Sequence, residues 1–437
     1  MTYNETIEYL FNSAPLFQNV GGDAYKEGLY NTLQLDEHFG HPHTHFQTIH
    51  VAGTNGKGSC SHTIASILQA SGLKVGLFTS PHLVDFKERI RVNGAMISEE
   101  YVIDFVAEHR CFFEPLHPSF FELTTAMAFK YFAEEAVDVA VIEVGLGGRL
   151  DCTNIIHPEV SVITNISFDH VQFLGNTLAK IAGEKAGIIK SCTPVVIGES
   201  VDETRPVFSA KAEEMNAPIC FAEESDEIID YKFSCKGGID YNTKSYGLIS
   251  GELGGYCQTK NASTILCAIA ALKKKGFRIT DDDVKSGFAN VCESTGLMGR
   301  WQTIQNSPKV IADTGHNIGG FEWITKQLNS VLEGFASDAG TLRIVFGMVN
   351  DKDISGVLSL LPHNAEYYFC QASVKRALPH EKIKELAKEY NLMGESYGGV
   401  ADAYNAALSD AQPDDFIYVG GSSFVVADLL THLHSMQ

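Results

Sequence analysis

The chain has 437 residues, which is more than one hydrophobic core usually supports, so its length predicts at least two domains. Its formal net charge of −21 argues against broad contacts with nucleic acid or an anionic membrane, because both require an excess of basic residues on one face. The sequence contains no apolar run of about 18 residues that could form a membrane helix, and its ten cysteines include no C-x-x-C pair. We therefore expect a cytoplasmic protein that binds neither nucleic acid nor membrane.

Residues 1–45 predict a helical lead-in. Apolar residues at 9–11 belong to a first helix, a turn is expected at Gly21-Gly22, and a second helix should run through Leu29, Leu33 and Leu35. Nothing catalytic is visible in this stretch.

A glycine-rich loop follows the first predicted strand. The β-branched run 49–52 leads into Gly-Thr-Asn-Gly-Lys-Gly-Ser at 53–59, and a helix should cover 60–70. Glycines allow backbone N–H groups to converge on phosphate oxygens, Lys57 adds a positive charge, and Ser59 adds a hydroxyl that can bind a metal. The spacing differs from the common G-x-x-x-x-G-K-[ST] pattern, so a purely structural turn is the alternative. The flanking strand and helix favour a site for a triphosphate.

Three further strands are predicted at 74–78, 137–144 and 160–164, and polar side chains lie at or after their ends. These side chains are Ser80, Glu143 and the pair Asp169-His170. Because parallel strands end at one edge of a sheet, Ser80, Glu143 and His170 should lie beside the phosphate loop and could hold magnesium. Taken singly, Glu143 could be a solvated carboxylate at a turn and His170 a structural loop residue.

Lys185 lies on a predicted helix that starts near residue 177. Its neighbours at 182–188 are mostly small or apolar, which allows the amine to be buried and its pKa to be lowered. A neutral amine could take up carbon dioxide and become a carbamate that binds a metal. The alternative is an exposed lysine that pairs with neighbouring carboxylates.

The remaining sequence predicts a second α/β unit. A strand at 194–197, a small antiparallel sheet within 225–256 and a helix at 259–275 precede a domain boundary near 296–300. Strands are then expected near 310–312, 342–346, 366–369 and 416–419, and helices near 319–332, 380–390 and 400–409. The sequence thus predicts an α/β protein in which a parallel-sheet ATPase domain, residues 1–297, precedes a smaller doubly wound, Rossmann-like domain, residues 298–437.

Seven stretches in this order resemble the folylpolyglutamate synthase and dihydrofolate synthase family of the Mur ligase superfamily. They lie at 50–59, 79–83, 143–151, 169–170, 184–190, 299–300 and 313–317. The resemblance implies an ADP-forming acid–amino-acid ligase whose ATP-binding domain of the Mur ligase central type precedes a glutamate-ligase domain. Such an enzyme adds L-glutamate to dihydropteroate and to the γ-carboxylate of reduced folates through an acyl phosphate.

The resemblance also implies roles for single residues. ATP would be bound by Thr54, Asn55, Gly56, Lys57, Gly58, Ser59, Asn261, Arg300 and Asp313. Two magnesium ions would be held by Ser80, Glu143, His170 and a carbamylated Lys185. The catalytic residues would be Lys57, His170 and Lys185. The other substrates would contact Phe121, Glu122, Leu150, Asp151, Cys152 and His316, where an aromatic face and a carboxylate suit a pterin ring.

Two positions depart from the family pattern. Thr314 stands where many relatives have a small residue in the motif D-G-A-H-N, and residues 19–26 do not match the L-G-L-E-R segment that usually precedes the phosphate loop. Contacts to the pterin from residues 19–26 are therefore not carried over.

Several alternatives stay open at this point. A monofunctional folylpolyglutamate synthase fits the same motifs. A ligase of peptidoglycan precursors would share the chemistry, but it typically has an N-terminal sugar-binding domain for which residues 1–45 are too short. A nucleotide-dependent switch would need the motif N-K-x-D, whereas residues 350–353 read N-D-K-D. A folate carrier would not need the metal ligands. We expect a monomer whose partners are L-glutamate, dihydropteroate and reduced folates.

Overall fold

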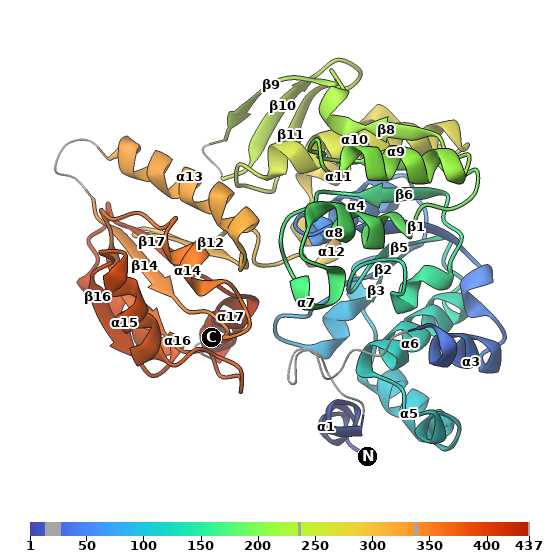
Figure 1. Cartoon of the computed structure of the whole chain (residues 1–437), viewed down its shortest axis with the longest axis horizontal. Helices are drawn as coiled ribbons and strands as arrows, with labels where there is room; N and C mark the ends of the chain where they lie inside the picture. The colour runs from blue at the N-terminus through green and yellow to red at the C-terminus, as the bar shows by residue number, and fades with distance from the viewer. Residues whose placement is uncertain (14–27, 235–236, 336–339, 436–437) are drawn as a thin grey trace. The chain divides into compact units, whose positions relative to one another are not determined.

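The computed structural model describes residues 1–13, 28–234, 237–335 and 340–435 (Figure 1). The chain forms two compact units. The first unit comprises Met1–Ser234, Gly238–Glu252 and Gln258–Leu297, and the second comprises Cys235–Gly237, Leu253–Cys257 and Met298–Gln437. Among the described helices, none is long and apolar enough to cross a membrane.

An eight-stranded sheet organises the first unit, with the order β4-β3-β2-β5-β1-β6-β7-β8. The strands from β2 to β8 in this order are parallel, whereas at the other edge β3 pairs antiparallel with β2 and β4 pairs antiparallel with β3. The bounds are β1 Gln47–Ala52, β2 Val75–Phe78, β3 Ile90–Val92, β4 Ala95–Met96, β5 Val139–Glu143, β6 Val160–Ile163, β7 Val195–Ile197 and β8 Ile219–Phe221. Every residue of β2, β5 and β6 is buried, as expected of parallel strands covered on both faces.

Helices cover both faces of this sheet (Figure 1). Along β5, Val139 and Val141 join one apolar cluster, and Ala140 and Ile142 join another. The first cluster includes side chains of α4 (Lys57–Ala70), α10 (Gln258–Lys274) and α11 (Asp281–Ala289). The second includes side chains of α1 (Tyr3–Ser13), α3 (Tyr30–His38), α5 (Glu99–Phe113) and α6 (Phe120–Glu134). The remaining helices of the unit are α7 (Val171–Leu174), α8 (Leu178–Ala186), α9 (Arg205–Glu214) and α12 (Val291–Thr295).

A small antiparallel sheet with the order β11-β10-β9 completes the first unit. Its strands are β9 Ile228–Phe233, β10 Ile239–Thr243 and β11 Gly247–Gly251. Ile239, Tyr241 and Ile249 are buried in the same cluster as α10, so one face of the small sheet extends the core.

The second unit contains a six-stranded sheet with the order β12-β13-β17-β14-β15-β16. All its strands are parallel except β12. The strands are β12 Gln302–Asn306, β13 Lys309–Asp313, β14 Leu342–Phe346, β15 Glu366–Cys370, β16 Gly394–Tyr397 and β17 Phe416–Gly420. The helices are α13 Ile318–Gly334, α14 Ile354–Leu358, α15 His380–Glu389, α16 Val400–Asp410 and α17 Ser423–Ser435.

The predicted fold class is confirmed, because a parallel-sheet unit precedes a second α/β unit. The sequence did not predict the antiparallel strands β3, β4 and β12 or the helices α5 and α6. The turn expected at Gly21-Gly22 lies outside the described residues.

Candidate active site

Four neighbouring strands of the first sheet end at the same level. Val51 of β1 pairs with Glu143 of β5, and Ala52 pairs with Ile163 of β6. On the other side of β5, Phe78 of β2 pairs with Ile142. The loops that carry the phosphate-loop residues, Ser80 and His170 therefore leave one edge of the sheet, where Glu143 is the last residue of β5. The predicted placement is confirmed for the strands, and the roles of the side chains stay predictions.

The phosphate loop depends on two glycines. Gly53 has a φ of +148°, and a Cβ there would lie 1.8 Å from Thr164 Oγ1. Gly56 has a φ of +81°, and a Cβ there would lie 2.4 Å from Asn261 Oδ1. Helix α4 begins directly afterwards, at Lys57. The first N–H groups of a helix have no partner within it and carry partial positive charge, so the end of α4 can bind anionic oxygens.

The loop after β6 holds the first half of the phosphate loop. The N–H of Thr54 donates to the Asn165 carbonyl at 3.0 Å, and the N–H of Asn55 donates to Asn165 Oδ1 at 3.0 Å. The hydroxyl of Thr54 accepts from the N–H of Ser167 at 3.1 Å. Sequence reasoning missed Asn165 and Ser167, although two polar residues directly after a strand that neighbours β1 are a usable signal. The N–H groups of Thr54 and Asn55 therefore bind protein oxygens. The N–H groups of Lys57, Gly58 and Ser59 lie in the first turn of α4, which can bind anionic oxygens.

Two lysines converge on one carbonyl of this loop. Lys185, on α8, is 4% exposed, and its Nζ donates to the Gly53 carbonyl at 2.8 Å. Lys57 Nζ donates to the same carbonyl and to that of Thr54, each at 3.1 Å. Desolvation, together with repulsion from Lys57, lowers the pKa of Lys185 to about 7. The burial that the sequence allows for Lys185 is confirmed, and its lowered pKa favours the neutral amine.

Glu143 and Ser80 supply oxygen atoms near the same strand ends. Glu143 is 4% exposed, and its charge acts on the buried Arg89, whose Nε donates to His82 Nδ1 at 2.7 Å. Ser80 is half-buried in the loop after β2. Carboxylate and hydroxyl oxygens suit a hard divalent cation, so Ser80 and Glu143 fit the predicted magnesium site.

His170 precedes α7 and has a φ of +50°, with its Nε2 3.8 Å from Asp169 Oδ1. In the described part of the chain, His, Cys, Asp and Glu side chains form no group of three or more that could hold a metal. The predicted ligands do not require such a group, because only Glu143 and His170 among them belong to these residue types.

Phe121 and Asp151 lie beside the loop that follows β5. A Cβ added at Gly145 would lie 2.4 Å from Phe121 Cζ, so the ring packs directly on this loop. Asp151 accepts hydrogen bonds from the N–H groups of Leu146 at 2.8 Å and Thr153 at 3.0 Å. Desolvation raises the pKa of Asp151 although these hydrogen bonds act against the rise. In the structure, Asp151 thus shapes the loop that carries Leu150 and Cys152.

Glu122 is also part of a local structure. Its Oε2 accepts from the N–H of Ser119, and its own N–H donates to Ser119 Oγ at 3.2 Å, which forms a capping box at the start of α6. The side chain is 3% exposed, and Asn31 Nδ2 lies 3.4 Å from the same oxygen. The sequence signal S-x-x-E at 119–122 was readable and was missed. From the sequence, only a substrate contact was predicted for Glu122.

Other predicted residues lie in the second unit. Asp313, at the end of β13, accepts from the N–H groups of Trp301 and Gly315, both at 2.8 Å. Desolvation raises the pKa of Asp313, against the effect of these hydrogen bonds and of the nearby Arg300. Arg300 donates to the hydroxyl of Thr314 and to the Gly299 carbonyl. Thr314, which departs from the family pattern, therefore binds a predicted nucleotide-site residue directly.

His316 and Asn261 complete the set. His316 is half-buried, and its Nδ1 lies 3.1 Å from the carbonyl oxygen of Thr314. Asn261 belongs to the first unit, where its Nδ2 donates to Gln258 Oε1 at 2.8 Å, and Gln258 in turn donates to Ser59 Oγ at 3.1 Å. The predicted nucleotide residues are thus distributed over both units.

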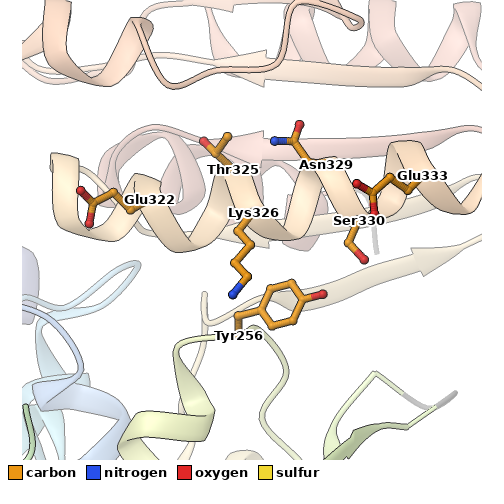
Figure 2. A pocket seen from close by; sticks show the side chains of 7 residues that line it. All are labelled: Tyr256, Glu322, Thr325, Lys326, Asn329, Ser330 and Glu333. Atoms are coloured by element: carbon orange, nitrogen blue, oxygen red, sulfur yellow. The ribbon is translucent and has the colours of Figure 1, made fainter.

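A hollow of about 460 Å³ on the second unit does not coincide with these residues. Figure 2 shows its lining side chains, which are Tyr256, Glu322, Thr325, Lys326, Asn329, Ser330 and Glu333. Lys326 Nζ lies 5.2 Å from the centre of the Tyr256 ring. The lining is mostly polar, unlike that of a typical small-molecule pocket, and includes no predicted site residue.

Comparison with known protein families shows to which family the fold and the motifs belong. The Mur ligase middle domain matches residues 51–272, and the Mur ligase glutamate ligase domain matches residues 299–423. A dihydrofolate synthase/folylpolyglutamate synthase from Bacillus subtilis is 36% identical over 426 residues, which are 93% of this chain and 95% of the relative. The chain belongs to the dihydrofolate synthase/folylpolyglutamate synthase family of Mur ligases.

Solved structures of this family share the whole fold. Escherichia coli FolC in complex with DHPP and ADP has a TM-score of 0.83 and 30% identity, covering 100% of this chain and 98% of that chain. The bifunctional folylpolyglutamate synthase/dihydrofolate synthase with Mn, AMPPNP and L-glutamate bound has a TM-score of 0.81 and 29% identity, covering 99% of this chain and 98% of that chain. The match to family members thus extends over both units of this Mur ligase.

Proposed function

We propose that this Mur ligase joins L-glutamate to dihydropteroate and to the γ-carboxylate of reduced folates, with ATP converted to ADP and phosphate. One observation carries the proposal. At a single sheet edge, the phosphate loop, the buried Glu143 and the buried Lys185 lie together, with Lys185 Nζ 2.8 Å from the Gly53 carbonyl. Family members that bind ADP, DHPP or L-glutamate support the choice of substrates.

The proposed reaction proceeds through an acyl phosphate. A carboxylate is a poor acyl donor, so its oxygen attacks the γ-phosphoryl group of ATP and ADP leaves. The amine of glutamate then attacks the activated carbonyl carbon, and phosphate leaves with the oxygen of the original carboxylate. Lys57 and the first N–H groups of α4 stabilise the negative charge on the phosphoryl oxygens.

Metal binding belongs to the same proposal. Ser80, Glu143, His170 and a carbamate on Lys185 would hold two magnesium ions, which supply positive charge to the transferring phosphoryl group when bound. Burial of Lys185 supports the carbamate, because only a neutral amine reacts with carbon dioxide, and its pKa is lowered to about 7. A relative that binds Mn together with AMPPNP supports a divalent cation.

The remaining contacts are assigned by domain. Residues 1–297 would bind ATP through the phosphate loop and Asn261, and residues 298–437 would contribute Arg300, Asp313 and His316. Phe121 would stack on the pterin ring, and the loop that carries Leu150, Asp151 and Cys152 would line its edge. Glu122 would contact the pterin only through the carboxylate oxygen that does not cap α6.

Ligation of radiolabelled glutamate, measured separately with dihydropteroate and with tetrahydrofolate, tests this function. Product with both acceptors is the expected result. Product with tetrahydrofolate alone would assign a monofunctional folylpolyglutamate synthase, and product only with a nucleotide-sugar peptide would assign a ligase of peptidoglycan precursors. With an acceptor whose carboxylate carries ¹⁸O, the label should appear in the released phosphate. Its absence from phosphate would rule out the acyl phosphate.

A further inference from the structure

Strand β9 forms an outer edge of the small antiparallel sheet. The sheet order β11-β10-β9 places β10 on only one side of it. Residues 229–233 are all exposed, and the three apolar side chains among them are 59% exposed for Ile229, 44% for Tyr231 and 41% for Phe233. Exposed apolar side chains at alternate positions of an edge strand commonly mark a surface that pairs with another strand.

The sequence of this edge is complementary to itself. Residues 229–233 read Ile-Asp-Tyr-Lys-Phe. When two copies are laid antiparallel about a two-fold axis at Tyr231, Asp230 lies opposite Lys232 of the second copy, and Ile229 lies opposite its Phe233. The arrangement thus pairs opposite charges twice and apolar side chains twice, which are the favourable cross-strand pairs of antiparallel sheets.

The backbone hydrogen-bonding groups of β9 alternate in direction as this pairing requires. The N–H of Ser234 donates to the Gly238 carbonyl at 2.9 Å, and the register continues through Tyr231 opposite Tyr241. Hydrogen-bonded and non-hydrogen-bonded pairs alternate in an antiparallel ladder, so Tyr231 occupies a non-hydrogen-bonded position with respect to β10. Its N–H and C=O therefore point away from β10, toward the side on which a second strand would lie.

The side chains of β9 are also suited to pairing with a second copy of the strand. Tyr231 lies across from the buried Tyr241, which itself pairs with the buried Ile249, so all three share the face that continues the core. The rings of Tyr231 and Phe233 meet edge to face, with their centres 6.0 Å apart. A second copy of the strand would cover this exposed end of the apolar face.

We propose that β9 is a self-association surface through which two copies of this chain pair antiparallel about Tyr231. Two three-stranded sheets then become one sheet of six strands. The contact is small, so the dimer is weak and forms at high protein concentration. This arrangement differs from the monomer expected from the sequence and does not depend on the catalytic function.

Sedimentation equilibrium over concentrations up to about 1 mM, at about 0.15 M salt to screen the net charge, measures the association. The wild-type chain should show a monomer–dimer equilibrium. Asp230→Lys and Lys232→Asp each place like charges opposite each other twice, and each should weaken the dimer roughly tenfold. The double variant Asp230→Lys/Lys232→Asp restores opposite charges across the contact and should recover part of the lost affinity, because Lys232→Asp also places a carboxylate opposite Asp240 of β10 in the same chain.

Leu248→Asp is the matched control, because Leu248 is 63% exposed on β11, the other edge of the same sheet. It should leave the association unchanged. A chain that stays monomeric over the whole range, or a double variant that fails to recover, would overturn the proposal. Loss of the dimer in Leu248→Asp would likewise overturn it, because the contact would then involve β11.

Discussion

The side-chain nitrogen Nζ of Lys185 lies 2.8 Å from the carbonyl oxygen of Gly53, to which it donates a hydrogen bond. Gly53 starts the phosphate loop, whereas Lys185 comes from α8, far along the chain. The phosphate loop and the proposed carbamate site are therefore directly connected. A change at either residue should affect both nucleotide binding and catalysis.

Lys185→Ala should reduce turnover by at least about 100-fold, because it removes a proposed metal ligand. A short carboxylate such as acetate should restore part of the activity by occupying the space of the carbamate. In the wild-type protein, ¹³C-labelled bicarbonate should give a carbamate resonance in the NMR spectrum. Lys180→Ala, which changes an exposed lysine on the same helix, should behave like the wild type. Undiminished turnover in Lys185→Ala would contradict the carbamate.

Lys57→Ala should lower kcat by about 10² to 10³-fold, because the positive charge at the phosphoryl group is lost. The melting temperature should change little, since Lys57 is only half-buried and its two acceptors are backbone carbonyls of its own loop. Calorimetry with an ATP analogue separates binding from chemistry. An unchanged kcat would exclude Lys57 from the proposed reaction.

Gly145→Ala tests the pterin contact of Phe121. The added methyl would lie 2.4 Å from Phe121 Cζ, so the ring must move. We expect KM for dihydropteroate to rise by about tenfold or more, which corresponds to about 1.4 kcal/mol, while KM for ATP changes little. Gly183→Ala is the control, because its added methyl would meet no atom within 4 Å other than the adjoining residues and backbone of its own helix. Equal changes in both KM values would indicate a general distortion of the loop rather than a pterin contact.

Thr314→Val removes the hydroxyl that accepts a hydrogen bond from Arg300 and keeps the side-chain shape. If Arg300 binds ATP, KM for ATP should rise by about five- to tenfold, as expected for the loss of a hydrogen bond to a charged group at a partly exposed site. Thr303→Val, an exposed position on β12, provides the comparison. If Thr314→Val and Thr303→Val have the same KM for ATP, Thr314 does not position Arg300.

Asp36→Asn should destabilise the first unit near neutral pH by about 1–2 kcal/mol. Asp36 is 5% exposed and accepts hydrogen bonds from His41 at 2.7 Å and His43 at 2.6 Å. Desolvation acts to raise the pKa of Asp36, but these interactions outweigh it and the pKa is lowered. A lowered pKa stabilises the fold above the unfolded-state pKa of about 3.9, and this stabilisation is lost as the pH falls through the folded-state value.

Urea unfolding of both proteins at several pH values measures this effect. The difference in unfolding free energy between the wild type and Asp36→Asn should be full near pH 7 and decrease below about pH 4. Asp104→Asn, at an exposed position on α5, should show neither the loss nor its pH dependence. A difference that is constant down to low pH would contradict the proposed interaction of Asp36 with the two histidines.

Sequence patterns predicted the buried parallel strands well because continuous apolar runs are their direct signature. The strand expected at 342–346 is β14, and the strand expected at 160–164 is β6 without its last residue. The helix expected from 177 begins at Leu178, with Thr177 as its N-cap. Because chain order and strand type fix which ends share a sheet edge, the meeting of the phosphate loop and Glu143 was predictable.

Contacts between side chains that are distant in sequence were not predictable. The motif S-x-x-E at 119–122 predicts the cap of α6, but it does not tell whether Glu122 also faces a ligand. The hydrogen bonds of Asn165 and Ser167 to the phosphate loop depend on the register of β6 beside β1. Likewise, the contact between Arg300 and Thr314 requires β12 and β13 to pair.

The second unit is not one continuous piece of chain. Leu253–Cys257 belongs to it, and the N–H of Tyr256 donates to Gln327 Oε1 of α13 at 2.9 Å. A chimera joined to a relative at residue 298 would therefore carry a hybrid second unit, in which this segment comes from one parent and α13 from the other. Recombination between family members should succeed more often when residues 253–257 are exchanged together with the carboxyl-terminal half.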